Sequence, residues 1–148
     1  MKRREFITLV GGAVAWPLAA RTQQPVKIAR IGWLTAQQAS SLAPYVDAFR
    51  GSLADLGLVE GRNLVIVFRY GDDVIERVPE LAAELAQLPV DVIVAQGAAV
   101  PVISKLGLTV PIVYVFSGDP VSAGFADSLA RPRDNMTGLT FMAADRPY

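Results

Sequence analysis

The sequence contains no cysteine and no histidine. Without cysteine, the chain cannot form a disulfide, a thiolate nucleophile, a Cys-ligated zinc site or a Cys-anchored lipid. Without histidine, it lacks the most common general base and the most common metal ligand of proteins. Hydrolases of the Ser-His-Asp type and most transition-metal enzymes are therefore excluded. We expect no catalytic residue, no metal ligand and no cofactor.

The sequence also lacks a net charge, because its 148 residues include 14 basic and 14 acidic side chains. These charges are unevenly distributed. Residues 1–24 carry four basic side chains and one acidic, whereas residues 25–148 carry ten basic and 13 acidic. A nucleic-acid-binding protein needs a basic surface, so the mildly acidic body argues against a nucleic-acid partner. The apolar fraction of 52% is sufficient for one domain with a buried core.

The first residues are predicted to be an export signal. A basic start that contains Arg3 and Arg4 is followed by an uncharged stretch over residues 6–20 and then by a polar segment, as in signal peptides. These 15 residues would form a helix of about 22 Å, too short to cross a hydrocarbon core of about 30 Å. The arginine pair followed by Phe6 favours the twin-arginine route. A general secretory signal and a retained amphipathic anchor are the alternatives.

Twin-arginine export implies a bacterial protein that the twin-arginine translocase delivers to the periplasm. We expect cleavage near residues 21–25, so that residues 1–24 are the signal peptide and residues 25–148 are the body. No second apolar run in the sequence approaches 18 residues, which predicts a soluble body.

From residue 25 onward, apolar runs alternate with amphipathic stretches. Continuous apolar strands are typical of a parallel sheet that is covered on both faces, and right-handed crossovers make such a sheet doubly wound. The predicted fold class is α/β, with a doubly wound, mainly parallel five-stranded sheet and helices on both faces. The predicted strands are residues 26–34, 64–70, 90–95, 110–116 and 137–142, and the predicted helices are residues 44–56, 72–88, 98–106 and 120–129.

Local signals set the expected helix starts. Ser41 is the expected N-cap of the first helix, with Pro44 in its first turn. Asp72 and Asp73 are expected to cap the second helix, although Pro79 argues that the true start lies close to that proline.

The loops that follow the strands are the candidate ligand site, because ligands of open α/β sheets bind beyond the carboxyl ends of the strands. Small or uncharged polar residues there can hold a small polar molecule without transforming it. Simple turns are the alternative interpretation, with Asp119 capping the next helix. The candidate ligand-binding residues are Thr35, Ala36, Gln96, Gly97, Ala98, Ser117, Gly118, Asp119 and Pro120.

A series of motifs resembles the twin-arginine-exported ABC transporter substrate-binding proteins with a type I periplasmic-binding-protein-like fold. The motifs include Gly57 to Asn63, Leu81 to Leu85, Gly118 to Val121 and Asn135 to Phe141. The resemblance implies two lobes with a ligand cleft between them, and partnership with a membrane permease and an ATPase. Relatives are about twice as long, so the chain resembles the N-terminal lobe only, in a truncated form. The loop at 96–99 reads Gln-Gly-Ala-Ala where relatives often have Thr-Gly-Gly.

The predicted function is the periplasmic solute-binding component of an ABC import system, without enzymatic activity. The solute is expected to be a small polar molecule, with an amino acid as one candidate. A doubly wound α/β enzyme and an exported sensory module are the alternatives. However, the loop after the first strand contains no glycine, which argues against a dinucleotide cofactor. Since a cleft usually buries 70% or more of its ligand, we expect the isolated chain to show no thermal shift with amino acids.

Overall fold

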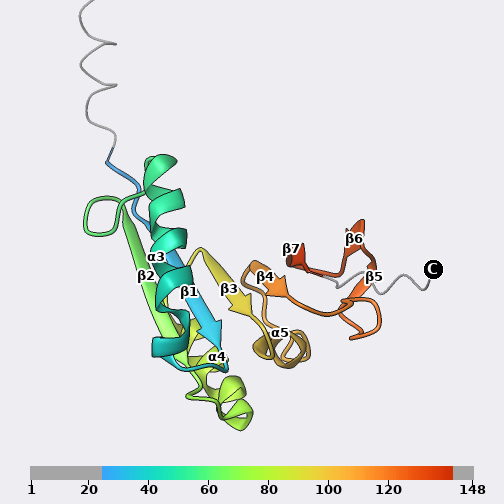
Figure 1. Cartoon of the computed structure of the whole chain (residues 1–148). Coiled ribbons are helices and arrows are strands. Elements are labelled where there is room, and N and C mark those ends of the chain that lie inside the picture. The colour runs from blue at the N-terminus through green and yellow to red at the C-terminus, as the bar shows by residue number, and fades with distance from the viewer. Residues whose placement is uncertain (1–24, 142–148) are drawn as a thin grey trace, which may run out of the picture.

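The structure, a computed structural model, describes residues 25–141. A central sheet organises this part of the chain. The predicted export residues Arg3, Arg4 and Phe6 lie outside this range. Five parallel strands are arranged in the order β2-β1-β3-β4-β7 (Figure 1). Their bounds are β1 Ala29–Thr35, β2 Leu64–Tyr70, β3 Val92–Gln96, β4 Ile112–Phe116 and β7 Met136–Thr140. The predicted five-stranded parallel sheet is confirmed.

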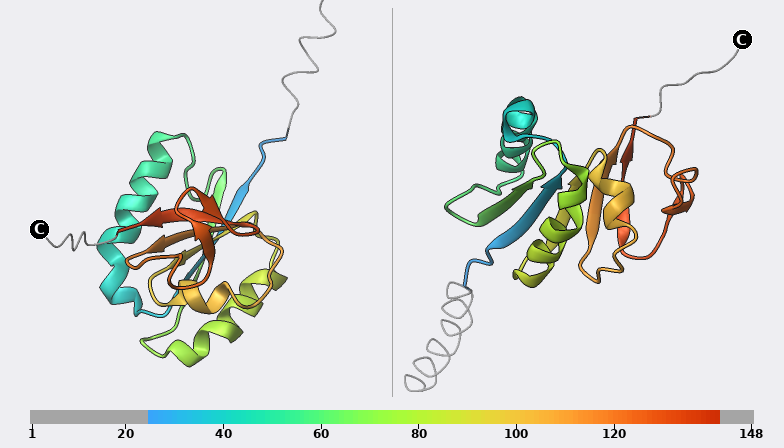
Figure 2. Two further views of the ribbon diagram at one scale, coloured as in Figure 1. Left: turned by 90° about the vertical axis from the view of Figure 1, so that its right-hand side faces the viewer. Right: turned by 90° about the horizontal axis from the view of Figure 1, so that it is seen from below.

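Helices cover both faces of this sheet, as predicted (Figure 2). Helix α3, Ala39–Asp55, lies on one face, and the 3-10 turn η1, Ile75–Arg77, leads into α4, Val78–Gln87, on the other. The short helix α5, Ala99–Ile103, packs beside α4. None of the helices that the structure describes is both long and apolar enough to cross a membrane.

The larger core lies between the sheet and the α4–α5 layer. Leu81 and Leu85 of α4 and Ile103 of α5 pack with the inward residues of the central strands, including Leu34 and Ile93. All five of these side chains are buried. Because each large aliphatic side chain contributes about 1.5–3 kcal/mol when fully buried, this layer accounts for most of the burial that stabilises the fold.

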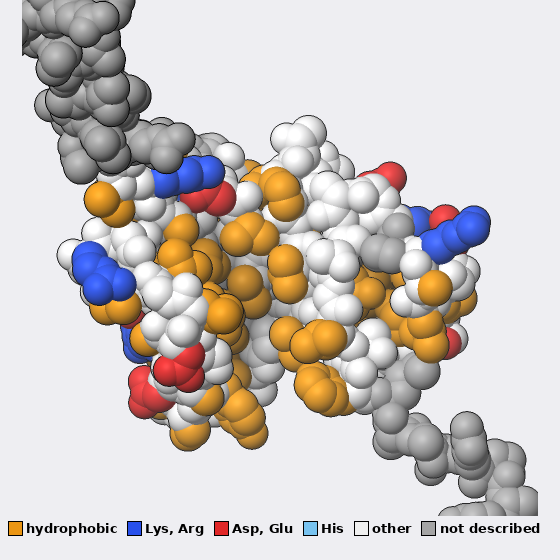
Figure 3. Space-filling view, turned by 90° about the horizontal axis from the view of Figure 1, so that it is seen from above, with side chains coloured by type: hydrophobic (Ala, Val, Ile, Leu, Met, Phe, Trp, Pro, Cys, Tyr) orange, Lys and Arg blue, Asp and Glu red, His pale blue; other side chains and the backbone are white. Residues whose placement is uncertain are grey.

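Helix α3 covers only part of the opposite face. Its Phe49 and Leu53 pack with Ile31 and Trp33 of β1, while the same face of β4 and β7 stays open. There Val113 is 37% exposed, and Leu139 is 64% exposed. Figure 3 shows hydrophobic side chains gathered around the hollow between the α3 side and the β7 side of the molecule.

The first helix begins earlier than predicted. Ser41 is not its N-cap, because the helix already starts at Ala39 and Pro44 lies inside it. Proline removes one helical N–H bond, but Leu42, which precedes it, is almost fully buried. Burial of this leucine against the sheet favours the extra turn. The predicted stop is right, since Gly57 follows the helix with φ of 87°.

Asp72 and Asp73 do not cap the second helix. Both adopt left-handed backbone angles, with φ of 53° and 64°, and form a turn before η1. The Asp72 carboxylate pairs with Arg77 at 2.5 Å, and that of Asp73 accepts a hydrogen bond from Gln38 at 2.6 Å. The alternative start is correct, because α4 begins at Val78, next to Pro79.

The predicted helix over residues 120–129 is wrong. The segment forms turns and then β5, Ala126–Ser128, which pairs antiparallel with β6, Arg131–Pro132. Gly124 has φ of 84°, which favours a turn over a helix. The chain reverses here so that Phe125 packs edge-on against Tyr114, with the ring centroids 5.2 Å apart. This contact anchors the turn to the sheet.

Candidate ligand-binding site

The strand order creates a switch point at the carboxyl ends of β1 and β3. After β1, the chain passes through α3 to β2 on one side, while β3 pairs with the other side of β1. The loops after β1 and β3 therefore leave the sheet in opposite directions, and such a crevice is the usual ligand site of open α/β folds. Thr35 and Gln96, the last residues of these strands, are paired in register.

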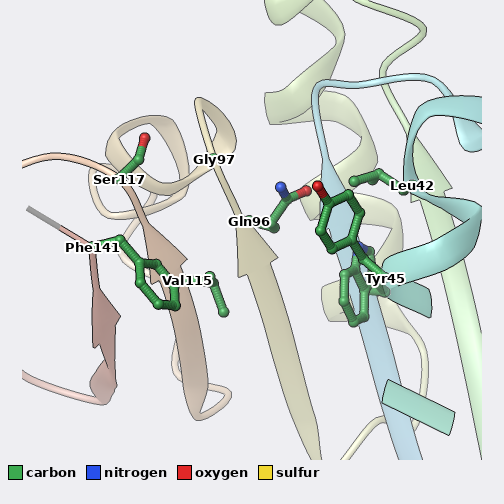
Figure 4. Close-up of a pocket in the computed structure, with 8 residues that line it drawn as sticks. Leu42, Tyr45, Gln96, Gly97, Val115, Ser117 and Phe141 are labelled. Carbon is green, nitrogen blue, oxygen red and sulfur yellow. The ribbon is translucent and has the colours of Figure 1, made fainter. Parts of the chain in front are cut away.

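A hydrogen bond joins the two strand ends. The Thr35 hydroxyl donates to the side-chain oxygen of Gln96 at 3.0 Å and accepts the backbone N–H of Gln37 at 3.1 Å. Thr35 is fully buried, so these bonds satisfy a hydroxyl that water cannot reach. The oxygen of Gln96 is thereby occupied, and its amide nitrogen lies on the side toward Ser117 (Figure 4).

A cavity of about 400 Å³ lies beside this pair, within the size range of small-molecule pockets, roughly 300–1,000 Å³. Side chains of β1 and α3 form one wall, and residues of β4 and the segment after β7 form the other (Figure 4). The cavity is lined by Trp33, Leu42, Tyr45, Gln96, Gly97, Val115, Ser117 and Phe141.

The structure brings three of the nine predicted site residues into the cavity: Gln96, Gly97 and Ser117. The other six do not line it. Thr35 lies behind Gln96, to which it is bonded, and the remaining five are Ala36, Ala98, Gly118, Asp119 and Pro120. The sequence interpretation missed the apolar wall of Trp33, Leu42, Tyr45, Val115 and Phe141. The alternation of side chains along β1 would have placed Trp33 on the same face as Thr35.

The loop after β1 is fixed against the turn that follows β2. The N–H groups of Gly71 and Asp73 donate to the carbonyl oxygens of Thr35 and Ala36 at 2.9 and 2.7 Å. A Cβ atom on Gly71 would lie 2.9 Å from the Ala36 Cα, closer than real Cβ contacts. Glycine at this position therefore lets the two loops approach, and the approach holds Ala36 in place.

Asp119 stabilises its own turn. Its two carboxylate oxygens accept hydrogen bonds from the backbone N–H of Val121 at 2.9 Å and from the hydroxyl of Ser122 at 2.6 Å. The Ser122 hydrogen bond, and then the Val121 hydrogen bond, lower the pKa of the Asp119 carboxyl below its ordinary value. The carboxylate is thus a turn-forming group, as the alternative interpretation of this loop predicts, although no helix follows it.

We expect the Asp119 pKa to rise in the variant Ser122→Ala. The substitution removes the hydrogen bond that contributes most to favouring the ionised carboxylate, so protonation should begin at a higher pH. A pH titration of the side-chain carboxyl ¹³C resonance measures the midpoint. Ser128→Ala, which removes an exposed hydroxyl from β5, is the control and should leave the midpoint unchanged. An unchanged midpoint in Ser122→Ala would contradict this assignment.

The cavity lining is uncharged. Its polar groups are the amide of Gln96, the hydroxyls of Tyr45 and Ser117, and the indole of Trp33. Among residues 25–141, no cluster of three or more acidic side chains could hold a metal ion. The arrangement can donate hydrogen bonds to a small molecule against flat apolar walls, but it does not offer an acid and a base facing one another.

Residues 33–145 match the family described as ABC transporter substrate binding protein. The chain belongs to this family. No curated protein sequence matches the chain significantly.

Solved structures share the fold of this family member at low sequence identity. The ligand-free, open structure of a substrate binding protein with adhesive properties from Clostridium difficile is 24% identical, with a TM-score of 0.70 over 80% of this chain. A conserved domain protein from Vibrio cholerae is 23% identical, with a TM-score of 0.70 over 77% of the chain. An ABC domain from Streptococcus pneumoniae, solved with L-Trp, is 22% identical, with a TM-score of 0.68 over 77% of the chain.

This substrate-binding family member spans only part of those proteins. It covers 41% of the Clostridium difficile chain and 39% of each of the other two. The shared part is the α/β lobe described above.

Proposed function

We propose that the protein is the solute-binding component of an ABC import system and holds a small polar molecule in the cavity at the β1–β3 switch point. The observation that carries the proposal is this cavity, which lies where open α/β folds bind ligands in a chain of the substrate-binding family. The cavity combines apolar walls with a few polar groups, which is typical of small-molecule sites.

The proposal includes export and partners. The arginine pair at Arg3 and Arg4 and the residue Phe6 support delivery by the twin-arginine translocase to the periplasm. Residues 1–24 would then be a signal peptide that is cleaved near residues 21–25, and the body would form the N-terminal lobe. A permease and an ATPase would take the solute onward, because proteins of this family serve ABC transporters.

Binding without chemical change is favoured over the doubly wound enzyme. Catalysis by side chains requires an acid and a base, or a nucleophile with its base, within hydrogen-bond reach. The cavity residues that the structure describes include one serine and no carboxylate, lysine or arginine. This composition supports a site that holds its ligand unchanged.

We infer that an aromatic amino acid is a candidate solute. Aromatic side chains from opposite walls, Tyr45 and Phe141, can contact a ring from two sides (Figure 4). The Streptococcus pneumoniae domain of similar fold was solved with L-Trp, which supports testing this class first.

Titration of the ¹⁵N-labelled chain with L-phenylalanine, L-tryptophan and L-glutamate tests the proposal. We expect the two aromatic amino acids to shift the amide resonances of Gly97 and Ser117, with weak affinity because a single lobe encloses little of the ligand. L-Glutamate should leave these resonances unchanged. Residues at the amino ends of the strands, away from the cavity, should not respond to any of the three solutes. Asn63, which directly precedes β2, is one of them.

The variant Gln96→Ala should weaken this binding about tenfold, because it removes a cavity donor. The matched control is Gln87→Ala, which removes an exposed glutamine at the end of α4 and should bind as the unmodified chain does. Equal affinity in the two variants, or resonance shifts confined to residues at the amino ends of the strands, would overturn the proposed site.

A further inference from the structure

The sheet has an exposed edge at β2, the outermost strand beside β1 (Figure 1). Residues Leu64 to Phe68 of this strand are all apolar, and its register with β1 runs without a β-bulge or a proline. An edge strand offers unpaired N–H and C=O groups to other strands, and natural proteins protect such edges with charges, prolines or bulges. The edge of β2 therefore needs a protecting group if the chain is to stay single.

The backbone groups of β2 that face away from β1 can be identified from the hydrogen bonds at its two ends. The Asn63 carbonyl oxygen accepts the N–H of Ala29 at 2.8 Å, and the Gly71 N–H donates to the Thr35 carbonyl oxygen at 2.9 Å. Because the bonding direction alternates along a strand, the odd-numbered residues of β2 bond β1. The residues whose backbone groups face outward are Leu64, Ile66, Phe68 and Tyr70.

Two of these outward carbonyl groups are covered by the chain itself. The Leu64 carbonyl oxygen accepts the N–H of Gly61, in the loop before the strand, at 3.3 Å. The Phe68 carbonyl oxygen accepts a hydrogen bond from Nη1 of Arg69 at 2.9 Å. The guanidinium is anchored by Glu84 of α4, whose carboxylate accepts the Nε–H of Arg69 at 2.7 Å. A second strand could reach Phe68 only by displacing Arg69.

The outward residues between these points fit a second copy of the same strand. Antiparallel pairing about a two-fold axis at Phe68 places Phe68 opposite its copy and Ile66 opposite Tyr70. Outward residues that face one another in this way exchange both N–H···O bonds. Aromatic pairs and aromatic–β-branched pairs also stabilise sheets. Arg69 would lie opposite Val67, so no like charges meet directly.

We propose that the outer edge of β2 is a docking strand for a second copy of the chain, and that Arg69, anchored by Glu84, keeps this edge closed. Dimerisation would require two guanidinium groups, one from each copy, to leave the Phe68 carbonyl oxygens. Hydrogen bonds from charged donors are stronger than neutral ones, so their loss opposes pairing. The inference goes beyond ligand binding and does not depend on the proposed function.

The variant Arg69→Val removes the covering group and leaves a β-branched side chain that suits a strand. We expect self-association about a hundredfold tighter than in the unmodified chain, because two charge-assisted hydrogen bonds are no longer lost on pairing. Sedimentation equilibrium over a dilution series measures the mass, which should double. Arg131→Val is the matched control, because it removes an exposed arginine from β6, and it should stay monomeric where Arg69→Val is a dimer.

Hydrogen exchange locates the contact within the dimer. In the unmodified chain, the outward amides of Ile66, Phe68 and Tyr70 should exchange faster than the amide of Val67, which faces β1. In the Arg69→Val dimer these three amides should become protected. A dimer without this protection would overturn the proposal. Assemblies larger than a dimer would also overturn it, because pairing of β2 with the other sheet edge of the next copy gives open chains.

The variant Glu84→Ala tests the anchor without changing β2. Glu84 is exposed on α4, and alanine is the best helix former. Freed from its carboxylate partner, Arg69 should cover Phe68 less firmly, so this variant should also dimerise, more weakly than Arg69→Val. Circular dichroism checks that both variants are folded. If Arg69→Val does not fold, a folded Glu84→Ala that stays monomeric at every concentration would still contradict the proposal.

Discussion

Replacing Gly138 with alanine is expected to destabilise the protein by about 3 kcal/mol, the upper end of the cost of overpacking. Gly138 lies in β7 opposite Tyr114 of β4. An added Cβ would overlap the carbonyl oxygen of Tyr114 and lie 2.7 Å from its ring atoms Cγ and Cδ2. The ring cannot move away easily, because Tyr114 is buried and packs edge-on against Phe125. The clash would therefore separate β7 from the sheet.

Urea unfolding followed by circular dichroism measures the free energy of unfolding of this variant. Gly51→Ala is the matched control, because Gly51 lies in α3 and an added Cβ would meet nothing within 4 Å. Alanine there should stabilise the protein by about 0.5–1 kcal/mol, since glycine weakens a helix interior. Equal and small effects of the two substitutions would contradict the close approach of β4 and β7.

The sheet could be predicted from the sequence because its strands carry apolar side chains on both faces, including the face of β4 and β7 that α3 leaves open. Strands of this kind appear as continuous apolar runs, and the second strand was predicted at residues 64–70, the bounds that β2 has in the structure. The end of the first strand was also nearly right, at residue 34 against Thr35. The predicted start at residue 26 was wrong, since β1 begins at Ala29. Val26 and Ile28 extended the apolar pattern of the strand, but both are exposed.

The errors arose where tertiary contacts outweigh local preferences. Asp72 and Asp73 resemble helix caps, but their carboxylates pair with Arg77 and Gln38 in a left-handed turn. Residues 120–129 have a helix-like start, but the burial of Phe125 against the sheet reverses the chain at Gly124. Nothing in the local sequence signals these partners.

The polar part of the candidate site was predictable, but of its apolar wall only Trp33 was, from the alternation of side chains along β1. Gln96 and Ser117 directly follow strand cores, and strand ends can be located from apolar runs. Tyr45 and Phe141 enter the cavity because of the position of α3 over the sheet and the direction of the chain after β7. Both depend on packing between elements that are far apart in the sequence.

Thr35→Val should destabilise the protein by about 2 kcal/mol and weaken ligand binding. Valine has nearly the shape of threonine, but it leaves the side-chain oxygen of Gln96 and the N–H of Gln37 without their partner. Loss of the two hydrogen bonds, each worth about 0.5–1.5 kcal/mol, gives a cost of this size. Gln96 would then be free to rotate, so the amide nitrogen that faces the cavity would lose its fixed position. Urea unfolding and the amino acid titration measure the two effects.

Thr35→Ser is the control that separates the hydroxyl from the shape of the side chain. Serine keeps the hydroxyl that bonds Gln96 and Gln37 but loses a buried methyl group, so it should cost only about 1 kcal/mol and should bind ligand nearly as before. If valine bound ligand as well as serine does, the Thr35–Gln96 hydrogen bond would have no role in positioning. If valine instead lowered affinity while serine did not, the bond that joins the ends of β1 and β3 would be part of the binding machinery, even though Thr35 itself does not line the cavity.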